Sequence, residues 1–324
     1  MTRCKRMGWK GFKKLSMGLL CMPLLALAAE PRIVVSIKPI HSLVARVMQG
    51  VGEPLLLVTG GASPHDYNLK PSEVRAIDQA QAVFWIGPNL ESFLVKPLDQ
   101  VQDRARVVTL LDTPGLTVLP LRQGGAWESH AHEPAAQEQA NKGDDHEPGY
   151  RADRDPHIWL DPVNAIAMVH RITAVLGEID TTHRADYQRN GAALISDLEQ
   201  LNQQLAAELA PVQKQPYLVF HDAYQYFERR YGLNPVGAVV VSAARQPGAR
   251  RVVEIQARIR DLQVHCLFSE PQFQPVLVDT IIANSAVHRG VLDPLGAELP
   301  AGSNAYFQLL RGLATALQGC LNSA

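Results

Sequence analysis

Four polar side chains at widely separated positions could together bind a metal ion: His65, His157, His221 and Asp293. Neutral imidazole nitrogens with at most one carboxylate suit Zn²⁺, which takes four ligands in a tetrahedral arrangement. Manganese usually prefers more oxygen ligands. A single loop histidine is more often an ordinary hydrogen-bonded residue, so a zinc site depends on the fold bringing these four side chains together.

Each of the four lies beside the end of an expected secondary-structure element. His65 follows the apolar residues 55–58 in a segment rich in glycine and proline. His221 and Asp293 each follow an expected strand of the second half of the chain, and His157 precedes an expected helix. Open α/β sheets bind ligands at the carboxyl ends of their strands. We therefore expect two of the four side chains from each half to meet in a cleft.

Apolar segments alternate with helical patterns along most of the chain, which indicates an α/β fold whose strands are parallel because each connection is a crossover. The expected strands are residues 33–37, 55–58, 82–86, 107–110, 217–220, 236–240, 265–268 and 287–292. The expected helices are residues 40–49, 72–79, 90–101, 162–176, 222–231, 248–262, 274–283 and 303–318. The pattern predicts two lobes, each a mostly parallel sheet flanked by helices, with the metal between the lobes.

The two lobes are expected to cover residues 29–180 and 211–324, joined by one long helix over residues 181–210. This joining segment contains no proline and has leucines at helical spacing. A helix of that length spans about 40 Å, the width of a domain. Within the first lobe, residues 123–155 have few large apolar side chains and are expected to form a disordered loop. The histidines of this loop are His130, His132 and His146.

The N-terminus has the pattern of a secretory signal peptide. Residues 1–14 carry six Lys or Arg side chains and no acidic residue, and the apolar residues 15–29 end in small residues. The alternative, a membrane anchor, needs about 20 apolar residues. We expect residues 1–28 to be removed by cleavage after Ala28, with cleavage after Ala29 as the alternative. The mature chain is expected to be a monomer in the periplasm.

The charge of the expected mature protein excludes some partners. Removing the six positive charges from the formal net charge of −1 leaves −7. A chain of that charge is not expected to bind nucleic acid or to insert into a membrane. Of its cysteines only Cys266 and Cys320 remain after cleavage. In an oxidising compartment this pair is most simply a disulfide, with two buried free thiols as the alternative.

Five segments carry a resemblance to a known family: residues 61–67, 157–162, 220–227, 269–273 and 292–296. With them, the mature chain resembles the zinc-binding proteins of bacterial high-affinity zinc ABC importers, the ZnuA-type members of the metal-specific solute-binding family. The resemblance implies Zn²⁺ held between two lobes by His65, His157 and His221 and then delivered to a membrane permease, without catalysis. It also implies that residues 123–155 match the family's acidic, histidine-rich loop and that Cys266 and Cys320 match its disulfide.

Two departures from the family pattern affect the site. Some relatives have Glu directly before the first ligand histidine, whereas this chain has Pro64 there, so Asp293 or water must complete the zinc coordination. The loop at residues 123–155 is also poor in histidine for the family, which makes a second metal site there doubtful.

Two other functions agree with parts of the pattern. A manganese or iron carrier of the same family would use a similar site. A secreted zinc hydrolase also uses three histidines with an open fourth position and needs a general base. The nominal bases are Asp66, Asp222, Glu270 and Asp293. No HExxH sequence accompanies them, and Asp66 and Asp222 are equally suited to begin helices or to orient the imidazoles.

Overall fold

The computed structural model describes Met1 and residues 31–122, 127, 153–240, 248–273, 276–283 and 285–322. Pro31–Ala324 forms one compact unit. Apart from Met1, the predicted signal peptide lies outside the described residues. So does most of the predicted loop at residues 123–155, including His130, His132 and His146.

The first sheet has four parallel strands in the order β2-β1-β3-β4. The strands are β1 (Ile33–Val35), β2 (Leu55–Leu56), β3 (Ala82–Trp85) and β4 (Arg106–Thr109). The helices along this part of the chain are α1 (Lys38–Val47), α2 (Pro71–Asp78), η1 (Ser92–Leu94), α3 (Val95–Asp99) and η2 (Leu110–Asp112). Every residue of β1 and β3 is buried, as expected for central parallel strands covered on both faces.

The second sheet repeats this arrangement in the order β6-β5-β7-β8, again all parallel. Its strands are β5 (Pro216–His221), β6 (Asn234–Val240), β7 (Cys266–Ser269) and β8 (His288–Val291). The accompanying helices are α6 (Gln225–Tyr231), α7 (Ala249–Asp261) and α8 (Val276–Ile282). The predicted fold class, two parallel sheets flanked by helices with one long helix, is therefore confirmed.

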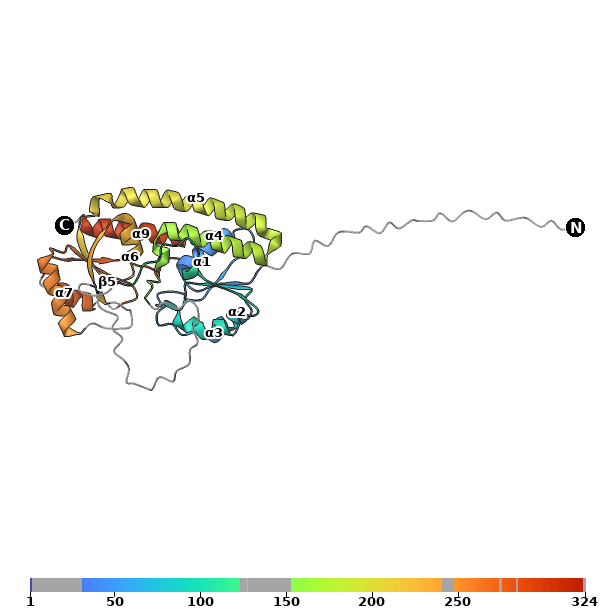
Figure 1. The fold of residues 1–324 in the computed structure, drawn as a ribbon, viewed down its shortest axis with the longest axis horizontal. Helices are drawn as coiled ribbons and strands as arrows, with labels where there is room; N and C mark the ends of the chain where they lie inside the picture. Colours follow the sequence, from blue (N-terminus) through green and yellow to red (C-terminus); the bar gives the residue numbers. More distant parts are fainter. Residues whose placement is uncertain are drawn as a thin grey trace, which may run out of the picture. The chain divides into compact units, whose positions relative to one another are not determined.

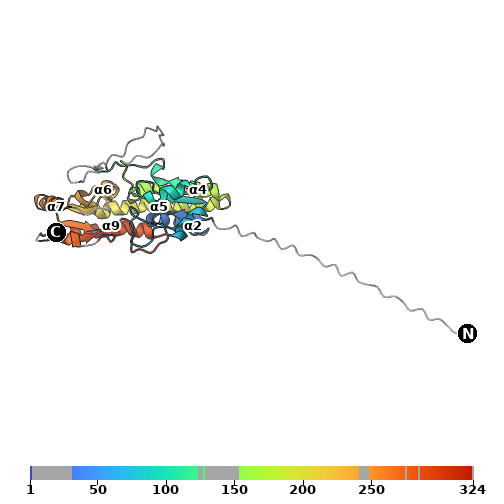
Figure 2. The same ribbon diagram turned by 90° about the horizontal axis from the view of Figure 1, so that it is seen from below.

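The long helix α5 (Arg184–Leu209) runs beside α4 (Pro162–Ile179) and α9 (Ala305–Leu321) (Figures 1 and 2). Short 3-10 turns adjoin these helices: η3 (Ile158–Leu160), η4 (Thr181–His183) and η5 (Ala210–Val212). The buried side of α5 consists of residues at helical spacing: Tyr187, Gly191, Leu194, Leu198, Leu201, Leu205 and Leu209. This apolar stripe is what fixes the helix to the rest of the protein. Of the helices in the described ranges, none has both the length and the apolar character of a membrane span.

Both sheets contribute to one hydrophobic core. Val35 of β1 and Val219 of β5 belong to the same buried cluster, which also contains side chains of α1, α4, α5 and α9. The adjacent residues Val34 and Leu218 belong to two separate, smaller clusters. Successive strand residues point to opposite faces of a sheet. One face of each sheet therefore packs against a common layer of helices. The other face of each sheet packs into one of the two smaller clusters.

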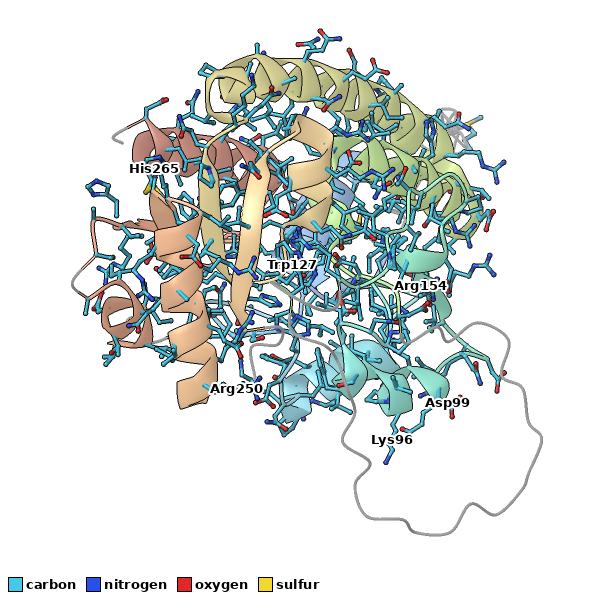
Figure 3. All side chains as sticks on the ribbon, turned by 60° about the vertical axis from the view of Figure 1, so that its left-hand side comes forward. Lys96, Asp99, Trp127, Arg154, Arg250 and His265 are labelled. Carbon is cyan, nitrogen blue, oxygen red and sulfur yellow. A yellow bond between two sulfur atoms is a disulfide. The ribbon has the colours of Figure 1, made fainter. Side chains whose placement is uncertain are left out.

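A disulfide joins the second sheet to the last helix. Cys266 at the start of β7 is bonded to Cys320 in the last turn of α9, with an S–S distance of 2.03 Å. Figure 3 shows this bond in yellow beside His265. The predicted pairing is confirmed, and the alternative of two free thiols is wrong.

Two predicted helices are shorter than expected, for identifiable reasons. The helix predicted at residues 90–101 is α-helical only at Val95–Asp99, because it contains Pro97, and proline is tolerated only in the first turn of a helix. The helix predicted at residues 222–231 begins at Gln225 because His221 is still the last residue of β5.

Candidate metal centre

Three histidines from distant parts of the sequence meet in the structure. One ring nitrogen each of His65, His157 and His221 lies within 4.8 Å of the other two. The centroids of their rings are 5.6, 5.4 and 5.2 Å apart. Nitrogens that share a tetrahedral Zn²⁺ stand roughly 3.4 Å apart, because Zn–N bonds are about 2.0–2.1 Å long. The three nitrogens therefore lie close enough together to be candidates for one shared ion.

The ends of the strands position these histidines. His221 is the last residue of β5. His65 follows β2 in a turn that contains Gly60, whose φ of +69° lies in the left-handed region that favours glycine. His157 directly precedes η3, and Asp161 then caps the start of α4 with its side chain. The ligands are thus held by backbone whose direction is set by buried strands and by a capped helix.

Asp155 orients the ring of His157. Its Oδ1 accepts hydrogen bonds from the backbone N–H of His157 at 3.0 Å and from the ring Nδ1 at 2.8 Å. With Nδ1 bonded to the carboxylate, Nε2 is the nitrogen left for a metal. Burial, together with the neighbouring His221, lowers the pKa of His157 well below its usual value. The ring is therefore neutral at pH 7 and able to bind a metal.

Glu270, directly after β7, is the carboxylate next to His221. Its Oε1 lies 3.5 Å from Nδ1 of His221, and both side chains are buried. Burial alone would lower the pKa of His221, but the charge of Glu270 outweighs it and raises that pKa above its usual value. Burial also raises the pKa of Glu270. As pH rises, the pair of His221 and Glu270 therefore keeps its proton to a higher pH than His65 or His157 does.

His65 has different surroundings. Its Nε2 is buried and has no hydrogen-bond partner among the described residues. Burial, assisted by His221 and His157, lowers the pKa of His65 well below its usual value. A buried polar atom without a partner is rare in proteins and requires an explanation such as a bound ion. A metal shared with the other two imidazoles would supply the missing partner.

A cavity of about 20 Å³ adjoins the three histidines. Besides the imidazoles and Glu270, its lining includes the apolar side chains of Leu90, Trp159, Phe273 and Leu295. This volume suits an ion or a single water, whereas pockets for organic ligands measure roughly 300–1,000 Å³. The apolar walls lower the local dielectric constant and so strengthen the attraction between a cation and its ligands.

Asp293 lies outside the group of three histidines and organises a turn. Its Oδ1 accepts hydrogen bonds from the backbone N–H of Leu295 at 3.0 Å and of Gly296 at 2.9 Å, and its Oδ2 accepts one from Ala297 at 2.5 Å. The side-chain amide of Gln272 also donates to Oδ1, at 3.2 Å. Direct binding of Asp293 to the metal stays a prediction.

Arg122, which directly precedes the predicted loop, is bonded to the residue that follows His221. The guanidinium group of Arg122 forms ion pairs with Asp222 and, at 2.8 Å, with Glu228. The same group stacks on the ring of Trp127, 3.5 Å from its centroid (Trp127 is labelled in Figure 3). Burial raises the pKa of Glu228 to about 7, although Arg122 opposes the shift. Asp222, the residue after β5, is thus paired with an arginine and not with an imidazole.

The carboxylates beside the imidazoles are not the two that the sequence suggested as orienting groups, although Glu270 was among the nominal bases. Asp66 and Asp222 were candidates, but neither hydrogen-bonds an imidazole among the described contacts; Asp155 and Glu270 lie beside the rings instead. Asp155 had a local signal, because an aspartate can bond the backbone N–H two residues later. Glu270 reaches His221 only because β7 pairs with β5, which no local pattern specifies.

Two parallel four-stranded sheets, with a long helix and a histidine cluster beside their strand ends, are the features of a two-lobed, metal-binding solute-binding protein. The model of the family described as "ZnuA: Zinc-uptake complex component A periplasmic" matches residues 33–320. The chain belongs to this family of transport proteins.

Individual relatives and solved structures carry the same family name. The "High-affinity zinc uptake system protein ZnuA" of Brucella suis biovar 1 is 45% identical over 307 residues, which cover 90% of this chain and 91% of the relative. A solved structure described as "Crystal structure of ZnuA" is 25% identical with a TM-score of 0.73, over 89% of this chain and 98% of that one. The "138-173 ZnuA deletion mutant plus zinc bound" is 25% identical with a TM-score of 0.70, over 89% and 97%.

Proposed function

We propose that this protein captures Zn²⁺ in the periplasm and delivers it to the membrane permease of an ABC importer, as the binding component of high-affinity zinc uptake. The observation that carries this proposal is the group of three converging imidazoles. The buried Nε2 of His65, without a partner among the described residues, supports a metal as the missing contact. Zinc is favoured as the metal because the Brucella relative is named as a zinc uptake protein and the related deletion mutant has zinc bound.

The proposed zinc ligands are His65, His157 and His221, with Asp293 or water in the fourth position. Pro64 precedes His65, so no carboxylate is available from that position. His65 follows a strand of the first sheet and His221 ends a strand of the second. One ion bound to both would hold the two sheets in a single relative position, and the permease would recognise that position.

We also propose that the mature protein begins after Ala28, is a monomer and does not insert into the membrane. Its lobes would cover residues 29–180 and 211–324 on either side of a linking segment at 181–210. The basic and apolar pattern of the N-terminus and the periplasmic description of the family support export. The loop at residues 123–155 would collect zinc weakly. In the related deletion mutant, zinc is bound although a segment of that protein is absent.

An enzymatic role is not proposed. A zinc hydrolase needs space for a substrate next to the metal-bound water. The cavity beside the histidines measures about 20 Å³ and is lined partly by apolar side chains, which suits a bare ion. Glu270 is the buried carboxylate nearest to His221, and it lies on the Nδ1 side of that ring.

Metal selectivity tests the proposal. We expect the purified protein, stripped of metal, to bind Zn²⁺ at least about tenfold more tightly than Mn²⁺ or Fe²⁺, because nitrogen ligands favour zinc in the usual order of divalent metals. The measurement is a competitive calorimetric titration, with metal analysis of protein isolated from the periplasm as a second readout. Tighter binding of Mn²⁺ or Fe²⁺, or either metal in the isolated protein, would favour the other carriers of this family.

The pH dependence of zinc affinity should correspond to the release of one proton. His65 and His157 have lowered pKa values and are already neutral at pH 7, whereas the pKa of His221 is raised by Glu270. Below the pKa of His221, zinc must displace its proton, so affinity should fall about tenfold per pH unit. Above that pKa affinity should change little. Competition with a chelator at several pH values measures this slope. A slope of three protons would contradict the assignment.

A further inference from the structure

The turn organised by Asp293 is also held from the other side, by a buried lysine. Lys38, the first residue of α1, is 6% exposed. Its Nζ donates hydrogen bonds to the backbone carbonyls of Gly296 at 2.5 Å, Ala297 at 2.9 Å and Leu299 at 2.7 Å. An ammonium group has three donors, and all three are used here. Asp293 binds the N–H groups of this turn while Lys38 binds its carbonyls.

This turn lies beside the loop that carries His65. A Cβ atom added to Gly61 would stand 3.9 Å from Cβ of Ala297, an ordinary van der Waals contact. Pro294 and Leu295 on one side and Ser63 and Pro64 on the other line the same cavity. The turn at residues 294–299 therefore lies next to the His65 loop. Lys38 and the carbonyls that it binds are 258 to 261 residues apart in the sequence.

The His65 loop needs such support more than the other ligands do. His157 is oriented by Asp155 and His221 lies beside Glu270. Among the described contacts of His65, the hydrogen bond from its backbone N–H to Ser63 Oγ is long, at 3.3 Å, and its Nε2 has no partner. The position of the His65 ring must therefore come from the packing of its loop.

We propose that Lys38 is a positioning residue for metal binding: it holds the turn at residues 294–299 so that the turn supports the loop of His65. On this view Asp293 acts mainly on the same turn, from the N–H side. The inference rests on the proposed function, because it concerns the geometry of the zinc ligands. The effect should fall mainly on His65, because His157 and His221 keep their own carboxylates. The same turn also accepts a hydrogen bond from Trp159, at the carbonyl of Pro294.

Zinc affinity of Lys38→Met tests this proposal, because methionine has a similar length but cannot donate to the three carbonyls. We expect about a 10–100-fold loss of affinity, the usual cost of removing a group that orients a ligand. Lys96→Met is the matched control, because Lys96 is exposed on α3 and points away from the protein in Figure 3. The wild-type protein is titrated first. If it does not bind zinc, the proposed function fails, whereas unchanged affinity in a folded Lys38→Met protein overturns only this inference.

A double-mutant cycle separates positioning from general destabilisation. If Lys38 acts through His65, Lys38→Met should cost little in a His65→Ala protein and its full amount in a His157→Ala protein. The visible absorption of bound Co²⁺ should also change in Lys38→Met, because it reports the arrangement of ligands. Equal losses in both backgrounds, or an unchanged Co²⁺ spectrum, would overturn the proposal.

A second variant keeps the test decisive if Lys38→Met does not fold. Ala297→Gly removes the Cβ that faces Gly61 and loosens the turn without leaving a charge buried. The added backbone freedom should lower zinc affinity roughly two- to fivefold, and the loss should disappear in the His65→Ala background. Full wild-type affinity in Ala297→Gly would then contradict the proposal.

Discussion

Replacement of His157 by alanine should weaken zinc binding by more than about 100-fold, beyond the roughly 10–100-fold expected when a residue that orients a ligand is removed. The substitution deletes one of three imidazole nitrogens that lie within 4.8 Å of one another. His157→Ala also leaves the Asp155 carboxylate buried without the imidazole N–H that it accepts at 2.8 Å. Calorimetry with a competing chelator measures the change in Kd.

Asp155→Asn serves as a graded comparison. Its side-chain oxygen can still accept a hydrogen bond, but the charge that stabilises the Nδ1–H form of His157 is lost, so the loss should stay within roughly 10–100-fold. His170→Ala is the matched control, because His170 is exposed on α4. Wild-type affinity in His157→Ala, or an equal loss in His170→Ala, would show that the zinc ligands lie elsewhere.

Removal of the disulfide with Cys266→Ser and Cys320→Ser together should lower the free energy of unfolding by about 4 kcal/mol. The bond joins residues 54 positions apart, and the chain-entropy relation gives this value for a loop of that length. The linkage holds α9 against the second sheet, and α9 contributes to the core shared by both sheets. Urea unfolding followed by circular dichroism measures the difference.

The same experiment should leave the zinc site largely intact. Cys266 is at the start of β7, whereas Glu270 follows the other end of that strand, so zinc affinity should change little under conditions where both proteins are folded. Wild-type protein treated with a reductant is the control and should match the double variant in stability. A loss of stability below about 1 kcal/mol would mean that the unfolded chain gains little freedom when the bond is absent.

Local patterns were sufficient for most of the fold. Apolar segments of strand length alternating with helical segments predicted both parallel sheets, and the leucine spacing predicted the long helix α5. These features depend on residues that are near one another in the sequence. The errors occurred at ends of elements, as at Pro97 and His221, where one residue decides which conformation continues.

The candidate site was predicted in part. His65, His157 and His221 were chosen because they lie beside the ends of elements, and the structure brings them together. Asp293 was chosen for the same reason, but its carboxylate bonds the backbone of its own turn. A position beside a strand end predicts the part of the fold in which a side chain lies. Which group that side chain contacts depends on differences of a few ångströms, which local patterns do not specify.

The sequence by itself predicted the class of fold, the disulfide and the three histidines that the structure brings together, because periodicity, cysteine number and residue chemistry can be read without coordinates. Only the tertiary structure decided what surrounds those histidines. Glu270 reaches His221 through the pairing of β7 with β5, and Lys38 reaches a turn 258 residues away. Such contacts follow from strand order and helix packing, which join distant segments and leave no periodic trace in the sequence.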